Sequence, residues 1–455
     1  MAGRKPVIYL HVGAMKTGTS YLQQLLADNK EALLAQGILF PGDQPKSEQV
    51  AAVRDALRLR VDAEIRDRAN GAWPRLRAEM MAYEGRASLV SMEFLSFAAR
   101  DRARAVVRSL RGAEVHIILT VRDASRVIPA QWQETTQNRG TTSWPDFVEA
   151  IVSGGAAESA ATSDGRSEDN HEASDGADTL TAWRAFQRAM DVPRMLEAWG
   201  TTVPPDRLHV VLVPAPGSEP QELWTRFASV IGVDPSTCDP PGQQRNASLD
   251  YAAADLMRRV NVGVKDLGQQ AYGRTVKSYL CKQVLVARSG GSRVSTDRRL
   301  SEFALDWNHR MSDAIAQSGA QLVGVPEDLD VKPSHVGQLE PPPDGEVLDA
   351  ARDAVVGLEK LIKTRSRRLT QADRDAAGPH PARLTAPQVD SAAWESSDAP
   401  VEAAVADVVA LARHAVVLRA GYRRAEGKPA GDETFQASAQ STGLVSKVLR
   451  RIRNR

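Results

Sequence analysis

The stretch Val7–Leu26, VIYLHVGAMKTGTSYLQQLL, decides the fold class of this chain. Its first residues are apolar or β-branched, and their run is short enough for one buried strand. A turn with two glycines follows, and leucines then recur at helical spacing. A strand, a glycine turn and a helix in this order direct backbone N–H groups and the helix N-terminus toward an anion. The sequence therefore predicts an α/β protein with an anion-binding loop after its first strand.

The turn Gly13–Ser20 (GAMKTGTS) contains the residue types that hold a phosphate or a sulfate. Lys16 supplies a positive charge. Three side chains of the turn add hydroxyl donors: Thr17, Thr19 and Ser20. In the nucleoside triphosphate loop G-x-x-x-x-G-K-[ST], the lysine directly follows the second glycine. Here Lys16 stands before Gly18, so the turn departs from that pattern. The alternative interpretation is a plain strand–helix turn with a solvated lysine.

The composition is that of an ordinary globular protein of 455 residues, long enough for one large α/β domain and an extension. The net charge of +1 gives no reason to expect nucleic acid as a partner. Two cysteines, Cys238 and Cys281, are too few for a disulfide framework or a zinc site. No apolar run reaches about 18 residues, so we expect no transmembrane segment and a cytoplasmic location.

Two further apolar stretches, Ser88–Met92 and Glu114–Val121, read as strands. Ligands of open parallel sheets bind beyond the carboxyl ends of the strands, where Glu93 and Arg122 follow. A carboxylate there is a candidate general base, and His11 is the alternative, although a histidine within a strand is more often a hydrogen-bonded core residue. A guanidinium such as Arg122 suits a phosphate because its fork matches two oxygens. The competing interpretations are a surface or capping carboxylate and an ordinary ion-paired arginine.

Two motifs resemble the sulfotransferases that use PAPS (3′-phosphoadenosine 5′-phosphosulfate). The order Lys-Thr-Gly-Thr-Ser at 16–20 resembles their 5′-phosphosulfate loop. The stretch Val121–Glu134 resembles their strand ending in Arg-Asp and the helix after it, which implies that Arg122 binds the 3′-phosphate of PAPS. In that family a serine follows eight residues after the arginine, whereas this chain has Ala130. Three nearby side chains are candidates for the missing donor: Ser125, Gln131 and Gln133.

The resemblance covers roughly residues 5–335 and is closest to a bacterial, chiefly actinobacterial, branch of the family. It implies a three-layer sandwich with a central, mainly parallel sheet, which is the P-loop NTPase-like sulfotransferase fold. We accordingly expect one sulfotransferase-like domain over residues 1–335.

Composition distinguishes three further segments of the chain. Residues 153–178 are rich in Gly, Ala, Ser and acidic residues, which predicts a flexible insertion. A proline-rich linker at 336–346 precedes a helical extension over 347–455. Its last residues, Gly443–Arg455, are apolar and basic, so they are a candidate for peripheral contact with a membrane surface or a partner.

The resemblance implies transfer of a sulfuryl group from PAPS to a hydroxyl or amine of a small molecule, glycan or lipid. Lys16 and the donors of Thr17–Ser20 would hold the 5′-phosphosulfate, and Glu93 would take the proton of the acceptor. No metal is required, because the loop neutralises the leaving phosphate. Two other functions stay open: a kinase that uses ATP and Mg²⁺ with Asp123 as a metal ligand, and a non-catalytic nucleotide- or sulfate-binding relative, which Ala130 favours. The acceptor and the oligomeric state also stay open.

Overall fold

The computed structural model describes residues 5–59, 66–67, 69–163, 178–240, 248–288, 290–330, 336–375 and 385–427. The chain forms two compact units. The first unit consists of Met1–Gln131, Val148–Asn246 and Thr296–Gln338. The second unit consists of Trp132–Phe147, Ala247–Ser295 and Leu339–Arg455. This division differs from the expected single domain over residues 1–335.

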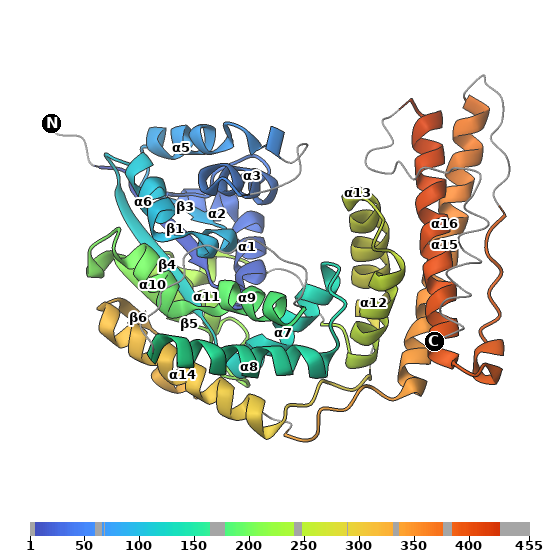
Figure 1. The fold of residues 1–455 in the computed structure, drawn as a ribbon. Helices are drawn as coiled ribbons and strands as arrows, with labels where there is room; N and C mark the ends of the chain where they lie inside the picture. The colour runs from blue at the N-terminus through green and yellow to red at the C-terminus, as the bar shows by residue number, and fades with distance from the viewer. Residues whose placement is uncertain are drawn as a thin grey trace. The chain divides into compact units, whose positions relative to one another are not determined.

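A six-stranded parallel sheet forms the centre of the first unit, in the order β2-β3-β1-β4-β5-β6 (Figure 1). Its strands are β1 (Val7–Gly13), β2 (Ile38–Leu39), β3 (Ala87–Ser91), β4 (Glu114–Val121), β5 (Leu208–Leu212) and β6 (Gln321–Val323). Because every pair is parallel, all carboxyl ends lie at one edge of the sheet. The α/β class and the three strands predicted at the start of the chain are confirmed.

Strand β1 lies between β3 and β4 because its side chains are buried on both faces, as in a central parallel strand. The chain leaves β1 toward β3 and later crosses to β4 on the other side. Connections that leave in opposite directions open a crevice beyond the strand ends. The loop after β1 lies at this point. His11 pairs with Ser91 in β3 and with Ile118 in β4, which sets the register at the carboxyl edge.

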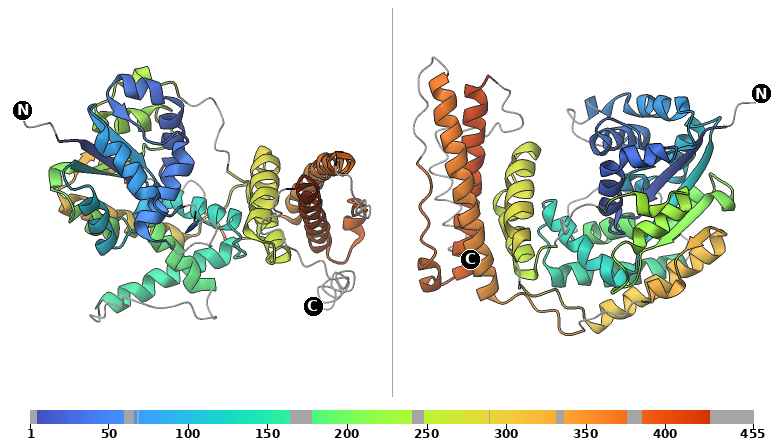
Figure 2. Two further views of the ribbon diagram at one scale, coloured as in Figure 1. Left: turned by 90° about the horizontal axis from the view of Figure 1, so that it is seen from above. Right: turned by 180° about the vertical axis from the view of Figure 1, so that it is seen from behind.

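Helices cover both faces of the sheet in a helix–sheet–helix arrangement (Figures 1 and 2). The helices of the first unit are α1 (Thr19–Asp28), α2 (Lys30–Ala35), α3 (Pro45–Leu57), α5 (Ala72–Ala82), α6 (Arg100–Ser109), α9 (Asp178–Met190), α10 (Val192–Gly200), α11 (Glu222–Ile231) and α14 (Arg298–Ser318). Apolar side chains of α1, α2 and α11 form one core with the sheet. Helix α10 contacts β4 and also packs on α6 and α14. The layers are consistent with the expected three-layer sandwich.

Helix α8 (Trp144–Ser163) includes the beginning of the stretch 153–178 that composition predicts to be flexible. Residues 153–163 are helical, and the reason is their alanine content. Alanine has the highest helix propensity of all residues and outweighs the two glycines in the segment. Residues 164–177 of the stretch lie outside the described residues.

The second unit is helical. Its longer elements are α12 (Tyr251–Gly263), the π-helical segment η4 (Tyr272–Val284), α15 (Asp344–Asp375) and α16 (Pro400–Ala425). Helices α15 and α16, from the predicted extension, pack along each other (Figure 1). Buried Arg365 of α15 donates to Thr275 Oγ1 in η4 at 2.9 Å and to the Ala415 carbonyl in α16 at 2.6 Å. The basic tail Gly443–Arg455 lies outside the described residues.

Aromatic packing explains why Trp132–Phe147 belongs to the second unit. The Trp132 ring lies 5.5 Å from the ring of Trp144 and 5.8 Å from that of Tyr251, between ring centroids. Such ring pairs contribute about 0.5–1.5 kcal/mol each beyond the area they bury. The second half of α7 (Ala124–Gln137) therefore packs with α12. No described helix of either unit is long and apolar enough to cross a membrane.

Candidate anion-binding site

The loop between β1 and α1 turns sharply at two residues with positive φ. Lys16 has a φ of 61° and Gly18 a φ of 84°. A Cβ on Gly18 would lie 2.4 Å from Leu223 Cδ2, so only glycine fits there. Helix α1 begins at Thr19 without a capping side chain. The N–H groups of its first turn therefore point toward the space beyond β1, where an anion would satisfy them.

The hydroxyls of the loop have different environments. Thr17 is fully buried, and its Oγ1 donates to the Ala14 carbonyl at 2.6 Å and lies 2.5 Å from Thr120 Oγ1. This hydroxyl holds the loop together. Thr19 is 4% exposed, whereas Ser20 is exposed on the first turn of α1. Lys16 is half-buried.

A buried chain of hydrogen bonds supports the loop from below. His11 Nδ1 lies 2.7 Å from Ser91 Oγ, and His11 Nε2 lies 3.2 Å from Thr120 Oγ1. Thr120 Oγ1 donates to the Gly13 carbonyl at 3.0 Å, so its own proton is used. A neutral imidazole donates through one of its nitrogens and accepts through the other. The chain links the ends of three strands to the loop.

His11 is 1% exposed, and burial lowers the pKa of its imidazole to about 3. The ring is neutral at physiological pH, and both of its nitrogens are engaged with side chains of the protein. This burial disfavours the alternative in which His11 is the general base. The structure instead makes it a core residue that positions the loop.

Glu93 lies beside the start of the loop, as the parallel strands predict. It opens the short helix η1 (Glu93–Phe97) directly after β3, and it is half-buried. Its Oε2 accepts a hydrogen bond of 2.5 Å from Gln23 Nε2 on α1. The Glu93 carbonyl lies only 3.4 Å from the place where a Cβ on Gly13 would stand. The carboxylate is therefore held between η1 and the helix that follows the loop.

Arg122 at the end of β4 reaches the same loop. Its Nη1 donates to the Lys16 carbonyl at 3.4 Å. Its Nε is buried and has no hydrogen-bond partner, and the side chain forms no ion pair with any described residue. Burial, and next the charge of Arg126, lower the pKa of Arg122 to about 10. A buried N–H that lacks an acceptor is costly, so an anion at this position would be stabilised.

Arg126 is a site residue that sequence reasoning missed. Its Nε pairs with the fully buried Asp123, its Nη1 donates to the Pro214 carbonyl at 3.0 Å, and its buried Nη2 has no partner. Helical spacing could not have found it, because Arg122 lies before the start of α7. Among the candidates for the missing donor, Ser125 binds Asp123 and Gln133 binds the Leu249 carbonyl. The buried carbonyl oxygen of Gln131 has no partner among the described residues, and that atom cannot donate.

Together these side chains define the class of the site: a cation-rich cluster of donors at the carboxyl edge of a parallel α/β sheet. Lys16, Arg122 and Arg126 supply three positive charges. The guanidinium groups of Arg122 and Arg126 each hold a buried N–H donor that no described acceptor satisfies. Among the described residues, no three His, Cys, Asp or Glu side chains gather as metal ligands. Comparisons with family models, curated proteins and solved structures find no match to this chain.

The buried imidazole makes stability depend on pH. Folding lowers the pKa of His11 from 6.5 to about 3. The stabilisation of the folded state by the neutral imidazole is therefore complete above pH 6.5, and it is lost as the pH falls toward 3. From pH 7.5 to pH 5.5 this one group should lower the free energy of unfolding by about 1.4 kcal/mol. Denaturant unfolding of wild type and His11→Asn at both pH values measures the difference. His309 is exposed, so His309→Asn is the control and should keep the wild-type pH dependence of the free energy of unfolding. An equal pH dependence in all three proteins would contradict a neutral, buried His11.

Proposed function

We propose that this protein is a sulfotransferase that moves a sulfuryl group from PAPS to a hydroxyl or amine acceptor, on the P-loop-type sulfotransferase fold. The observation that carries the proposal is the contact between Arg122 and the Lys16 loop, with a buried guanidinium N–H that lacks a partner. PAPS carries negative charge at two ends of one nucleotide. The loop could bind one charged end of such a ligand, and the arginines beside the loop could bind the other end.

The residues present fit both charged ends. The N–H groups of the loop and of the first turn of α1, with the Lys16 ammonium, would hold the 5′-phosphosulfate through Thr17–Ser20. Arg122 and Arg126 would hold the 3′-phosphate with the N–H groups that have no acceptor in the protein. Two neighbouring guanidinium groups balance the double charge of a phosphate. Arg126 thereby takes the role of the serine that Ala130 replaces.

PAPS would supply an activated sulfuryl group. The acceptor oxygen or nitrogen would form a bond to sulfur while the bond between sulfur and the 5′-phosphate oxygen breaks. The leaving group, 3′,5′-ADP, would keep the electron pair of the broken bond. Lys16 and the α1 N–H groups are placed to stabilise the charge that grows on that phosphate oxygen. Glu93 takes the proton that the acceptor loses. Gln23 donates to Glu93 Oε2 and thereby orients the carboxylate.

The kinase alternative needs a carboxylate that can bind Mg²⁺. Asp123, its candidate ligand, is fully buried and engaged with Ser125 and Arg126. Its carboxylate therefore fixes the start of α7 and the direction of Arg126. This arrangement favours the sulfotransferase proposal over the kinase.

The selectivity of the protein for nucleotides tests the proposal. We expect 3′,5′-ADP to bind without Mg²⁺ and more tightly than ATP. Arg122→Lys and Arg126→Lys keep the charge but lose N–H donors, so each should weaken 3′,5′-ADP binding at least about tenfold. Binding of 5′-AMP, which lacks the 3′-phosphate, should stay unchanged. Isothermal titration calorimetry measures all three ligands.

Arg104→Lys, an exposed position on α6, serves as the matched control and should bind like wild type. Equal losses for 5′-AMP and 3′,5′-ADP would assign the two arginines a structural role only. Tighter binding of ATP, with a requirement for Mg²⁺, would replace the proposal by the kinase.

Lys16→Ala should lower the rate of 3′,5′-ADP release from PAPS about 10²–10³-fold, because one fixed donor to the developing charge is lost. Lys16 is half-buried and lies in a loop, so the thermal midpoint should change little. Without an added acceptor, water takes the sulfuryl group, so chromatography follows the hydrolysis of PAPS to 3′,5′-ADP and sulfate. Lys5→Ala, before β1, is the control. A Lys16→Ala variant that keeps most of the rate would remove this lysine from the mechanism.

Glu93→Gln should lower transfer about 10²–10⁴-fold and abolish the acidic limb of the pH–rate profile, since the amide cannot accept a proton. Lys16→Ala, by contrast, should lower the rate at every pH and keep that limb. Glu84→Gln, an exposed carboxylate before β3, is the matched control. A Glu93→Gln profile with the wild-type shape would show that another group is the base.

A further inference from the structure

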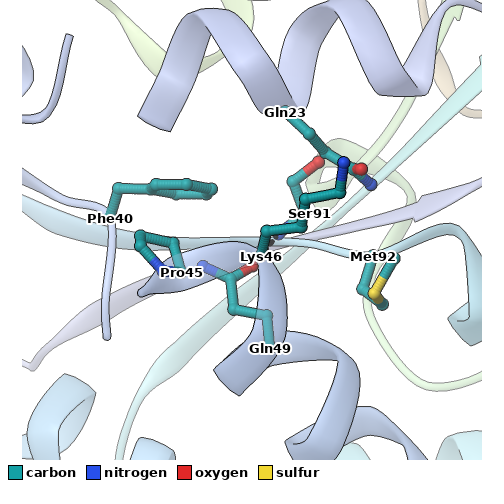
Figure 3. Close-up of a pocket in the computed structure, with 7 residues that line it drawn as sticks. All are labelled: Gln23, Phe40, Pro45, Lys46, Gln49, Ser91 and Met92. Atoms are coloured by element: carbon teal, nitrogen blue, oxygen red, sulfur yellow. Dashed lines mark hydrogen bonds between the residues drawn. The ribbon is translucent and has the colours of Figure 1, made fainter. Parts of the chain in front are cut away.

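The hollow beside Glu93, at the carboxyl end of β3, is too small for an organic ligand (Figure 3). Its cavity volume is about 10 Å³, which is room for roughly one water molecule. Phe40, Gln49 and Ser91 line it, and all three are almost completely buried. This hollow therefore identifies no acceptor.

A larger groove lies at the opposite edge of the sheet, where the strands begin. It is lined by the end of α6, the start of β4 and the turn that contains the short helix η2 (Pro205–Arg207) before β5. All of these segments belong to the first unit. The cavity volume of the groove is about 310 Å³, within the range of sites for small ligands. The eight residues of β4, a length of about 25 Å, separate it from Arg122 at the carboxyl edge.

Three arginines line the groove, and none of its described lining residues is acidic. Arg108 stands in the last turn of α6, Arg111 in the loop before β4, and Arg207 at the end of η2. Arg108 and Arg111 are exposed, and Arg207 is half-buried. Their guanidinium groups form no hydrogen bond or ion pair with any described residue. A cation in the last turn of a helix stabilises the helix dipole, which accounts for Arg108 alone.

Two acidic residues stand near the groove without lining it. Glu114 Oε1 accepts a hydrogen bond from His116 Nε2 at 3.1 Å. That hydrogen bond is the main cause that lowers the pKa of the Glu114 carboxyl, and the charge of Arg207 adds to it. Asp206 precedes Arg207 and is exposed to solvent. Because these two carboxylates do not balance three guanidinium groups, the groove keeps an excess of positive charge.

Apolar surface accompanies the arginines. Val107, Ala113 and Pro204 present half-buried or exposed apolar atoms to the groove, and Leu110 and Val115 lie buried in its lining. A bare inorganic ion would leave this surface in contact with water. An ester can instead place its organic group there, so the lining suits a ligand that is charged at one end and apolar at the other.

We infer that this groove binds a phosphate monoester with an apolar organic group. The three terminal oxygens of such a phosphate offer one acceptor to each guanidinium, and a guanidinium fork also matches two oxygens of one phosphate. The organic group lies on Val107, Ala113 and Pro204. The inference goes beyond the proposed function and does not depend on it, because none of these residues belongs to the site at the carboxyl edge.

Phenyl phosphate, phenyl sulfate and inorganic phosphate separate the effects of charge and of the apolar group. Each is titrated by calorimetry at pH 8, where a phosphate monoester is a dianion, into full-length Lys16→Ala, in which the loop after β1 has lost its cation. Phenyl phosphate should bind about three- to tenfold more tightly than phenyl sulfate, which has nearly the same shape and one charge less. It should bind about threefold more tightly than inorganic phosphate, which lacks the ring.

Two substitutions test the arginines directly. Arg108→Gln and Arg111→Gln, each added to Lys16→Ala, should weaken phenyl phosphate binding about three- to fivefold, and the two together at least about tenfold. Arg104→Gln, exposed on α6 outside the groove lining, is the matched control and should leave the affinity unchanged. Three results would each overturn the inference: no binding of phenyl phosphate, equal affinities for phenyl phosphate and phenyl sulfate, or an affinity that survives loss of both arginines.

The phosphate could come from a small ester or from a phosphorylated side chain. A tripeptide with a central phosphotyrosine carries the same headgroup as phenyl phosphate and is titrated into the same proteins. Tighter binding of the tripeptide, lost when Arg108 and Arg111 are replaced, would assign the groove to a phosphorylated protein segment. Weaker binding of the tripeptide than of phenyl phosphate would assign it to a small phosphate ester.

Discussion

The buried hydrogen bonds that run from Ser91 through His11 to Thr120, and from Thr120 to the loop, determine where the site can form. They exist because the parallel register places His11 opposite Ser91. Both ring nitrogens of His11 take part in this chain, and a neutral imidazole can donate through only one of them. Burial enforces that state. The geometry of the anion-binding loop thus depends on a group that contacts no ligand, and the loop inherits the rigidity of the sheet beneath it.

The site above this support is electrostatically unfavourable without a ligand. The charge of Arg126 lies close enough to lower the pKa of Arg122, and the carboxylate between them, Asp123, pairs only with Arg126. Both guanidinium groups also keep a buried N–H without a partner. Lys16 stands at a positive φ, which is uncommon for a residue with a side chain. Under the proposed function, a bound anion would relieve this repulsion and satisfy the buried N–H groups.

The sequence predicted the parts of this arrangement that depend on short-range signals. Apolar runs that end at Glu93 and Arg122 identify strands, and the parallel topology then brings these residues to the loop. Long-range packing and competing propensities decide the features that the sequence did not indicate. The contact of Trp132 with Tyr251 assigns Trp132–Phe147 to the second unit, and alanines extend α8 through glycines. Arg126 was missed because its direction is set by Asp123 and by the Pro214 carbonyl, which lies far along the chain.

The alanine at position 130 need not weaken the site. A serine hydroxyl there would offer one neutral hydrogen bond, whereas a guanidinium N–H offers a charge-assisted one, which is about twice as strong. Two of the three nitrogens of Arg126 are already held, by Asp123 and by the Pro214 carbonyl, so the remaining Nη2 is fixed before any ligand arrives. Little side-chain entropy is then lost on binding, and an oriented donor retains most of its interaction energy. Under the proposed function, an arginine fixed by the carboxylate directly after Arg122 would therefore take the place of the absent hydroxyl.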